Sequence, residues 1–177
     1  MKAEQISAVC FAMLEYYAGD PKRIQHFLKV HAFAKLIAEK ENLSEKDCVI
    51  IEIAALVHDI GIKNAELKYH SSMGKYQEQE GPAEAKALLE KFNIDAKVID
   101  RICYLVGHHH TYKAIDGIDY QILVEADFLV NIYEDSLPKS SAASILFKIF
   151  AASILFKIFK TRTGIRLLKT MYALENV

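Results

Sequence analysis

The stretch CVIIEIAALVHDIG, residues 48–61, decides the fold class of this chain. It is apolar at nearly every position until it reaches a His-Asp pair, His58 and Asp59. The four residues in front of it, SEKD at 44–47, are a capping-box-like start for a helix. The stretch therefore predicts a buried helix whose end carries two polar, chemically active side chains.

Apolar residues recur at helical spacing along most of the remaining chain. Further helices are predicted before Gly19, from about Pro21 to Asn42, from Pro82, after Asp95 and from Tyr120, the last being the most buried. The polar residues 64–81 are expected to form a long loop or a broken helix, and residues 112–119 a loop. Because no alternating strand pattern of useful length occurs, the predicted fold class is all-α, most simply as a single domain over residues 1–177.

The composition is that of an ordinary soluble globular protein, with 52% hydrophobic and 25% charged residues. A net charge of −1 gives no electrostatic basis for binding nucleic acid or an anionic membrane, so neither partner is expected. No run reaches the roughly 18 apolar residues of a membrane span, and the N-terminus is a poor signal peptide. The widely spaced Cys10, Cys48 and Cys103 predict reduced thiols in a cytoplasmic protein.

Several polar residues fall on apolar helix faces, where an uncompensated charge is costly. His26 lies on the apolar stripe of its helix, and Asp127 lies on one face of the most buried helix. With His58 and Asp59 they make a set of two imidazoles and two carboxylates, which suits Mn, Fe, Ni, Co or Zn. The alternative is a His-Asp couple that ends a helix without a metal.

Three consecutive histidines, His108, His109 and His110, follow a helix whose inner face includes Val106. Adjacent helical residues point about 100° apart, so the three cannot serve one centre equally. If the helix continues through Gly107, His110 lies on the inner stripe, His109 flanks it and His108 points away. The prediction is that His109 and His110 face the site.

The order of these residues resembles the HD superfamily of metal-dependent phosphohydrolases over about residues 20–135. The residues that carry the resemblance are His26, His58-Asp59 in ALVHDIG, His109-His110, and Asp127 in ILVEADFLVN. It implies a compact helical bundle with a metal site between central helices, in which His26, His58, Asp59 and Asp127 hold one ion. In two-metal members, residues equivalent to His109 and His110 serve a second ion. A further family histidine falls within residues 77–82, where this chain has none, so Glu78 or Glu80 could substitute.

The resemblance implies hydrolysis of a phosphoester, a nucleotide or another small phosphorylated metabolite, by water that one or two divalent ions activate. His58 and Asp59 would then be catalytic, together with Lys63 just beyond them. Lys63 and, secondly, Arg23 are the expected contacts to substrate phosphate. Two other readings stay open: a di-iron oxygenase of the HD type, and a non-catalytic, metal-stabilised binding module.

The chain beyond the expected metal-site core, about residues 138–177, reads as a helical extension that contains a tandem repeat. The nonapeptide AASILFKIF occurs at Ala142–Phe150 and again at Ala151–Phe159. On one continuous helix the two copies would present apolar residues to opposite sides, because nine residues make two and a half turns. The repeat is a recent duplication without function, an artefact of sequencing, or a partner surface, and we expect a homodimer through this region.

Overall fold

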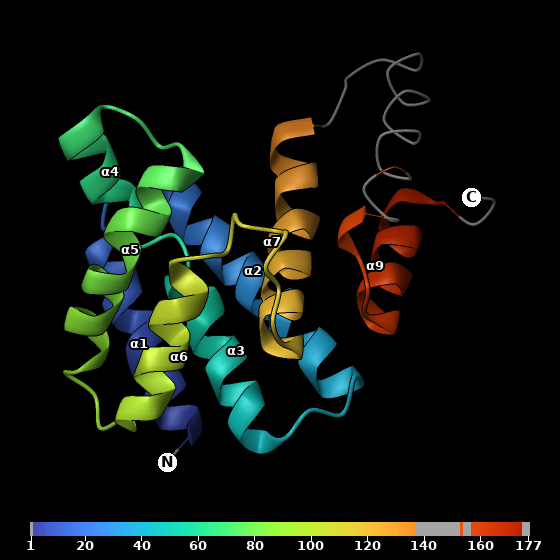
Figure 1. The fold of residues 1–177 in the computed structure, drawn as a ribbon, viewed down its shortest axis with the longest axis horizontal. Helices are drawn as coiled ribbons and strands as arrows, with labels where there is room; N and C mark the ends of the chain where they lie inside the picture. Colours follow the sequence, from blue (N-terminus) through green and yellow to red (C-terminus); the bar gives the residue numbers. More distant parts are fainter. Residues whose placement is uncertain (1, 137–152, 154–156, 175–177) are drawn as a thin grey trace.

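The computed structural model describes residues 2–136, 153 and 157–174. Its helices are α1 (Lys2–Tyr16), α2 (Pro21–Lys40), α3 (Glu45–Val57), α4 (Ile62–Tyr69), α5 (Gly74–Leu89), α6 (Ala96–Val106), α7 (Ile118–Ser136) and α9 (Arg162–Tyr172). Figure 1 shows α3 in the middle of the bundle, with α4 and α5 on one side and α7 and α9 on the other. No strand occurs among the described residues, which confirms the all-α prediction.

Helix starts lie close to where their capping residues predict them. Asp20, Ser44 and Asp95 each accept a hydrogen bond from a backbone N–H in the first turn of the following helix. Such a bond satisfies one of the four N–H groups that have no partner inside the helix. Pro21 follows Asp20 at the first position of α2, where its missing N–H costs nothing.

The core is built around α3, in which every residue from Ile50 to Val57 is buried. This helix contacts α1, α2, α6 and α7, so it is covered on all sides. A helix that is apolar all round is stable only in such a central position. The residues that follow it, His58 and Asp59, therefore emerge in the interior of the bundle rather than at its surface.

The segment between the His-Asp pair and Leu89 follows the broken-helix alternative, as α4 and α5 with a break between them. The prediction for Pro82 is wrong, because Pro82 lies inside α5 instead of opening a helix. A proline removes one hydrogen bond of the helix, but packing can offset that cost. Here α5 packs along α4 and α6, and Gly81 meets Gly61 closely enough that a side chain on Gly61 would strike the α5 backbone.

The described C-terminal part is anchored to α7 through a buried carboxylate. Glu125 is fully buried and accepts hydrogen bonds from the backbone N–H groups of Lys160 and Thr161. Burial raises the pKa of this carboxyl group, although these bonds act in the opposite direction. Phe159, the last residue of the repeat, is buried in the core.

Most of the tandem repeat lies outside the described residues, which omit 137–152 and 154–156. The expected homodimer through this region therefore stays a prediction. The three cysteines are free and partly buried. None of the helices in the described ranges is both long and apolar enough to cross a membrane.

Candidate metal centre

The backbone after α3 is held in place by two tyrosines of the first helical segment. The hydroxyl of Tyr17 donates to the carbonyl oxygen of Asp59 at 2.8 Å, and that of Tyr16 donates to Ile60 at 3.3 Å. On the other side, an added Cβ at Gly61 would lie only 2.5 Å from the carbonyl oxygen of Gln77. The chain passes between α1 and α5 with no spare room, which fixes the direction of the His-Asp pair.

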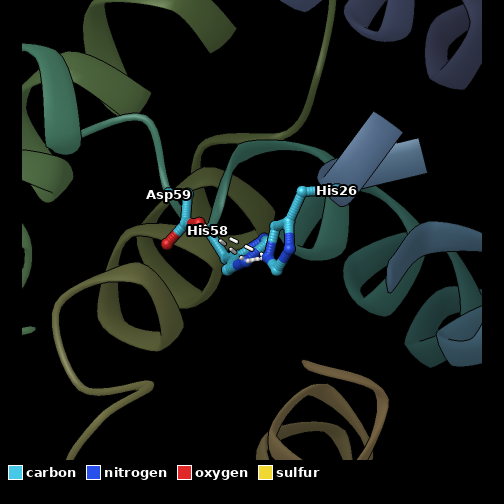
Figure 2. Close-up of side chains that lie close together, drawn as sticks. All are labelled: His26, His58 and Asp59. Atoms are coloured by element: carbon cyan, nitrogen blue, oxygen red, sulfur yellow. Dashed lines mark hydrogen bonds and ion pairs between the residues drawn. The ribbon is translucent and has the colours of Figure 1, made fainter. Parts of the chain in front are cut away.

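Four of the predicted ligands converge between α2, α3 and α7. Nε2 of His26 lies 3.3 Å from Nε2 of His58, 3.5 Å from Asp59 Oδ2 and 3.2 Å from Asp127 Oδ1. His58 Nε2 is 3.4 Å from Asp59 and 3.6 Å from Asp127. Figure 2 shows His26 reaching from α2 toward the pair that follows α3. All four side chains are largely buried.

The hydrogen bonds behind the imidazoles decide which nitrogen faces this cluster. His58 Nδ1 lies 2.9 Å from the Ala55 carbonyl oxygen, and His26 Nδ1 lies 2.9 Å from Glu134 Oε2. Because both partners can only accept, each Nδ1 carries the proton. The Nε2 atom of a neutral ring then presents a lone pair to the two carboxylates.

Lone pairs and carboxylates facing one another need a positive charge between them. Ligands at about 2.1 Å around a tetrahedral ion lie about 3.4 Å from one another, and the separations here are 3.2 to 3.6 Å. The donor set and the spacing therefore fit a divalent ion held by His26, His58, Asp59 and Asp127. The carboxylate behind His26 is the arrangement that orients many metal-bound histidines.

Without an ion, protons would take over the same compensating role. Burial lowers the pKa of His26, but the hydrogen bond to Asp127 and the charge of Asp59 outweigh it and raise the pKa to about 9. His58 is shifted upward too, since the two carboxylates outweigh its burial. Burial raises the pKa of both carboxyl groups, yet the neighbouring histidines hold each well below its usual value. The cluster thus needs positive charge, which protons on the histidines supply when no metal ion is bound.

A second possible metal-ligand group shares Asp59 with the first and adds His109 and His110. His109 is 1% exposed, and its Nδ1 lies 2.8 Å from the carbonyl oxygen of Val106. Its Nε2 has no hydrogen-bond partner and lies 3.4 Å from Asp59 Oδ1. A buried imidazole nitrogen without a partner, pointed at a carboxylate, is what a metal ligand looks like before the ion binds.

The order of His109 and His110 differs from the prediction, because α6 ends at Val106. His109, not His110, is the innermost ring, whereas His110 lies beside Gln77, with its Nε2 3.3 Å from the amide oxygen. His108 stacks on Tyr104 away from the cluster. The helical phase used for the prediction does not extend beyond Gly107, where the backbone turns.

Glu78 and Glu80 are not brought to the cluster as ligands. Glu78 instead accepts from the backbone N–H of His110 at 3.0 Å and from the hydroxyl of Thr111. It therefore fixes the histidine loop to α5. Glu80 accepts hydrogen bonds from the ammonium of Lys68 and from the hydroxyl of Tyr69, the latter at 2.9 Å.

The cluster opens into a cavity of about 470 Å³. Its lining includes the predicted Arg23 and, in addition, Lys22, Gln77, Tyr112, Phe128 and Asn131. Arg23 is paired with Asp20 and Glu66, while Lys22 has no ion-pair partner among the described side chains. Lys63 is not brought to the cavity, because its ammonium lies over the ring of Tyr16 and donates to that residue's carbonyl oxygen.

Residues that sequence reasoning did not find lie one and two turns after Asp127 on α7. Asn131 donates to Asp127 Oδ1 at 2.9 Å, and Glu134 accepts from His26 and Lys29. The spacings i+4 and i+7 from Asp127 would have placed both on the same face.

Comparison with known proteins gives the family. The family model described as HD domain matches residues 23–149, which is more than half of the chain. The chain belongs to the HD domain family. A search of the curated proteins finds no match.

Solved structures with the same fold include a predicted HD superfamily hydrolase from an uncultured Thermotogales bacterium. It is 21% identical, with 94% of this chain and 84% of that chain covered and a TM-score of 0.65. YpgQ of Bacillus subtilis is 18% identical, with 98% and 89% covered and a TM-score of 0.65. Its complex with ADP gives 20% identity, 98% and 90% coverage and a TM-score of 0.62. At these identities the likeness shows the fold alone, whereas the HD family and the His/Asp cluster together support a metal-dependent hydrolase in general.

Glu134 provides a test of how the first ligand is oriented. Glu134→Ala should weaken divalent-metal affinity by about 10–100-fold, the usual effect of removing a carboxylate behind a metal-bound histidine. Glu52→Ala is a matched control, because Glu52 also binds one histidine and one lysine, His31 and Lys35, but outside the cavity. Metal titration of both variants should show a loss in the first only. Equal losses would mean that Glu134 acts through overall stability.

Proposed function

We propose that this HD domain protein hydrolyses a phosphoester bond of a small metabolite, with a nucleotide as the favoured substrate class. The observation that carries the proposal is the cluster of two histidines and two aspartates beside a cavity whose lining also includes two cationic residues, Lys22 and Arg23. Metal ligands and positive charge around one cavity suit an anionic phosphoryl group that contacts both.

A divalent ion bound by the cluster would supply Lewis acidity, which lowers the pKa of a coordinated water and polarises the phosphoryl group. The residues around it have separate tasks. Glu134 and Asn131 hold His26 and Asp127 in their orientations. Lys22 binds the phosphate of the substrate through its free ammonium, and Arg23, held by two carboxylates, adds positive charge beside it.

Two aromatic residues in the cavity lining support the nucleotide class. Tyr112 and Phe128 line the cavity and lie edge to face, with ring centroids 5.2 Å apart. Aromatic side chains of this kind offer a surface against which a nucleobase can stack. The complex of Bacillus subtilis YpgQ with ADP shows that a protein of this fold binds a nucleotide.

Lys22 and Lys63 test the phosphate assignment against each other. Lys22→Ala should raise KM for the phosphoester about tenfold or more, because a contact between two charged groups contributes about 1.5–3 kcal/mol. Lys63→Ala should leave KM within about twofold, since its ammonium is directed at Tyr16. Steady-state kinetics on the same substrate would decide, and the reverse order of effects would return the phosphate role to Lys63.

The same cluster chemistry also suits the competing oxygenase reading, so the test must separate the two reactions. Hydrolysis is tested by measuring phosphate release from a panel of nucleotides and phosphomonoesters. The measurement is repeated with the protein loaded with Mn, Fe, Ni, Co or Zn. Oxygen uptake by the iron-loaded protein examines oxygenation. Phosphate release without oxygen consumption is the expected result, whereas oxygen uptake coupled to substrate loss would replace the proposal.

A further inference from the structure

Gln77 occupies a position in the cavity that its residue type does not explain. It lies in the first turn of α5, is 7% exposed and lines the cavity. A glutamine is seldom buried without a reason, because its amide needs partners for both the oxygen and the nitrogen. Its neighbours on the helix, Tyr76 and Glu78, are only partly buried.

The orientation of the amide is set by the backbone. Nε2 of Gln77 donates to the carbonyl oxygen of Ser72 at 2.6 Å. Since a carbonyl oxygen can only accept, the nitrogen end of the amide must be on that side. The oxygen, Oε1, is consequently directed at His110.

The oxygen therefore lies at the edge of the second ligand group. Oε1 is 3.3 Å from His110 Nε2, and ligand atoms of His110, His109 and Asp59 lie within 4.8 Å of one another. A separation of 3.3 Å matches the 3.2 to 3.6 Å between the ligand atoms of the first group. The unpartnered Nε2 of His109, buried in the same group, independently indicates that an ion belongs there.

We propose that the amide oxygen of Gln77 is a ligand of a second divalent ion, together with Asp59, His109 and His110. Gln77 then sets both the metal affinity of this second site and its preference among divalent metals. The two sites of the protein therefore differ in affinity and in metal preference. The inference rests on the proposed function only in assuming that the first group, around His26, binds its own ion.

The chemistry of the donors gives the direction of the difference. An amide oxygen is a neutral, hard ligand, which suits Mn²⁺ or Mg²⁺ better than Zn²⁺, whereas imidazole suits Zn²⁺. The first group has two imidazoles and two carboxylates, so its second carboxylate gives it more negative charge. The first ion should bind more tightly than the second. A chelator should therefore remove the second ion at a lower concentration than it needs to remove the first.

The experiment is a titration of the full chain, stripped with chelator, with Mn²⁺ and separately with Zn²⁺. Calorimetry and electron paramagnetic resonance of free Mn²⁺ count the ions and give their affinities. Gln77→Leu should retain the first ion and bind the second at least about tenfold more weakly. Gln77→His should bind the second Zn²⁺ about tenfold more tightly than the wild type does. Gln79→Leu, an exposed glutamine on the same helix, is the control and should bind both ions normally.

Each result has one meaning. Two unequal ions in the wild type, with only the second altered in the Gln77 variants, supports the proposal. One ion per wild-type chain at saturating Mn²⁺, or wild-type affinity for the second ion in Gln77→Leu, overturns it. If Gln77→Leu fails to fold, Gln77→His alone decides through its Zn²⁺ preference. Because the readout is binding, a protein that holds two ions but hydrolyses no phosphoester would refute only the proposed function.

Discussion

Asp59→Ala is expected to remove metal binding and hydrolysis together, with a loss in kcat of about 10³-fold or more. Asp59 is the only carboxylate that both ligand groups contain among the described residues. One of its oxygens faces His26 and His58, and the other faces His109. Its replacement therefore takes a charged ligand from each group at once.

Metal content and turnover are both measured on this variant. A fold defect would also lower both quantities, so a second variant and a folding check are needed. Asp59→Asn keeps the shape of the side chain and removes the charge, so it should fold normally and still lose most of its metal. Circular dichroism of both variants serves as the folding check. A folded Asp59→Ala protein with wild-type metal content would contradict the assignment of the cluster.

Gly61→Ala is expected to damage the site without touching any ligand. The added Cβ would lie 2.5 Å from the Gln77 carbonyl oxygen and 2.7 Å from the Gly81 nitrogen, both backbone atoms that cannot move away alone. Forcing a methyl group into such packing costs about 1–3 kcal/mol of folding stability. Because α5 carries Gln77 and Glu78, the shift should also lower metal affinity.

Gly19→Ala separates packing from general destabilisation. Gly19 has a φ of +88°, but nothing lies within 4 Å of an added Cβ. Alanine there should cost stability through its backbone conformation alone and leave metal affinity unchanged. Chemical denaturation and metal titration of both variants test the contrast, and normal metal affinity in a destabilised Gly61→Ala would show that α5 does not position the site.

The features that sequence predicted well depend on local chemistry. Capping residues such as Ser44 and Asp95 act within one helical turn, so their helices begin where the sequence places them. The positions of His26 and Asp127 follow from helical periodicity within long helices, and the structure brings both to one point.

The features that sequence did not predict depend on contacts between distant segments. The order of His109 and His110 is set after the end of α6, by Glu78 from α5 and by the hydroxyl of Tyr120, which donates to the His108 carbonyl oxygen. The polar sequence of residues 64–81 leaves a loop and a broken helix as alternatives, because the buried Gln77 and Glu80 find partners that are visible only in three dimensions. Nearness to Asp59 along the chain favours Lys63 as a phosphate contact, but the turn into α4 directs its ammonium to Tyr16.

The most direct test of the central claim is phosphate release measured alongside metal content on one preparation. The purified protein is stripped with chelator, assayed on a panel of nucleotides and phosphomonoesters, then reloaded with a single divalent metal and assayed again. We predict that at least one ion per chain is bound, that stripping abolishes phosphate release, and that reloading restores it. Phosphate release that persists in metal-free protein, or none across the panel from fully reloaded protein, would contradict the account.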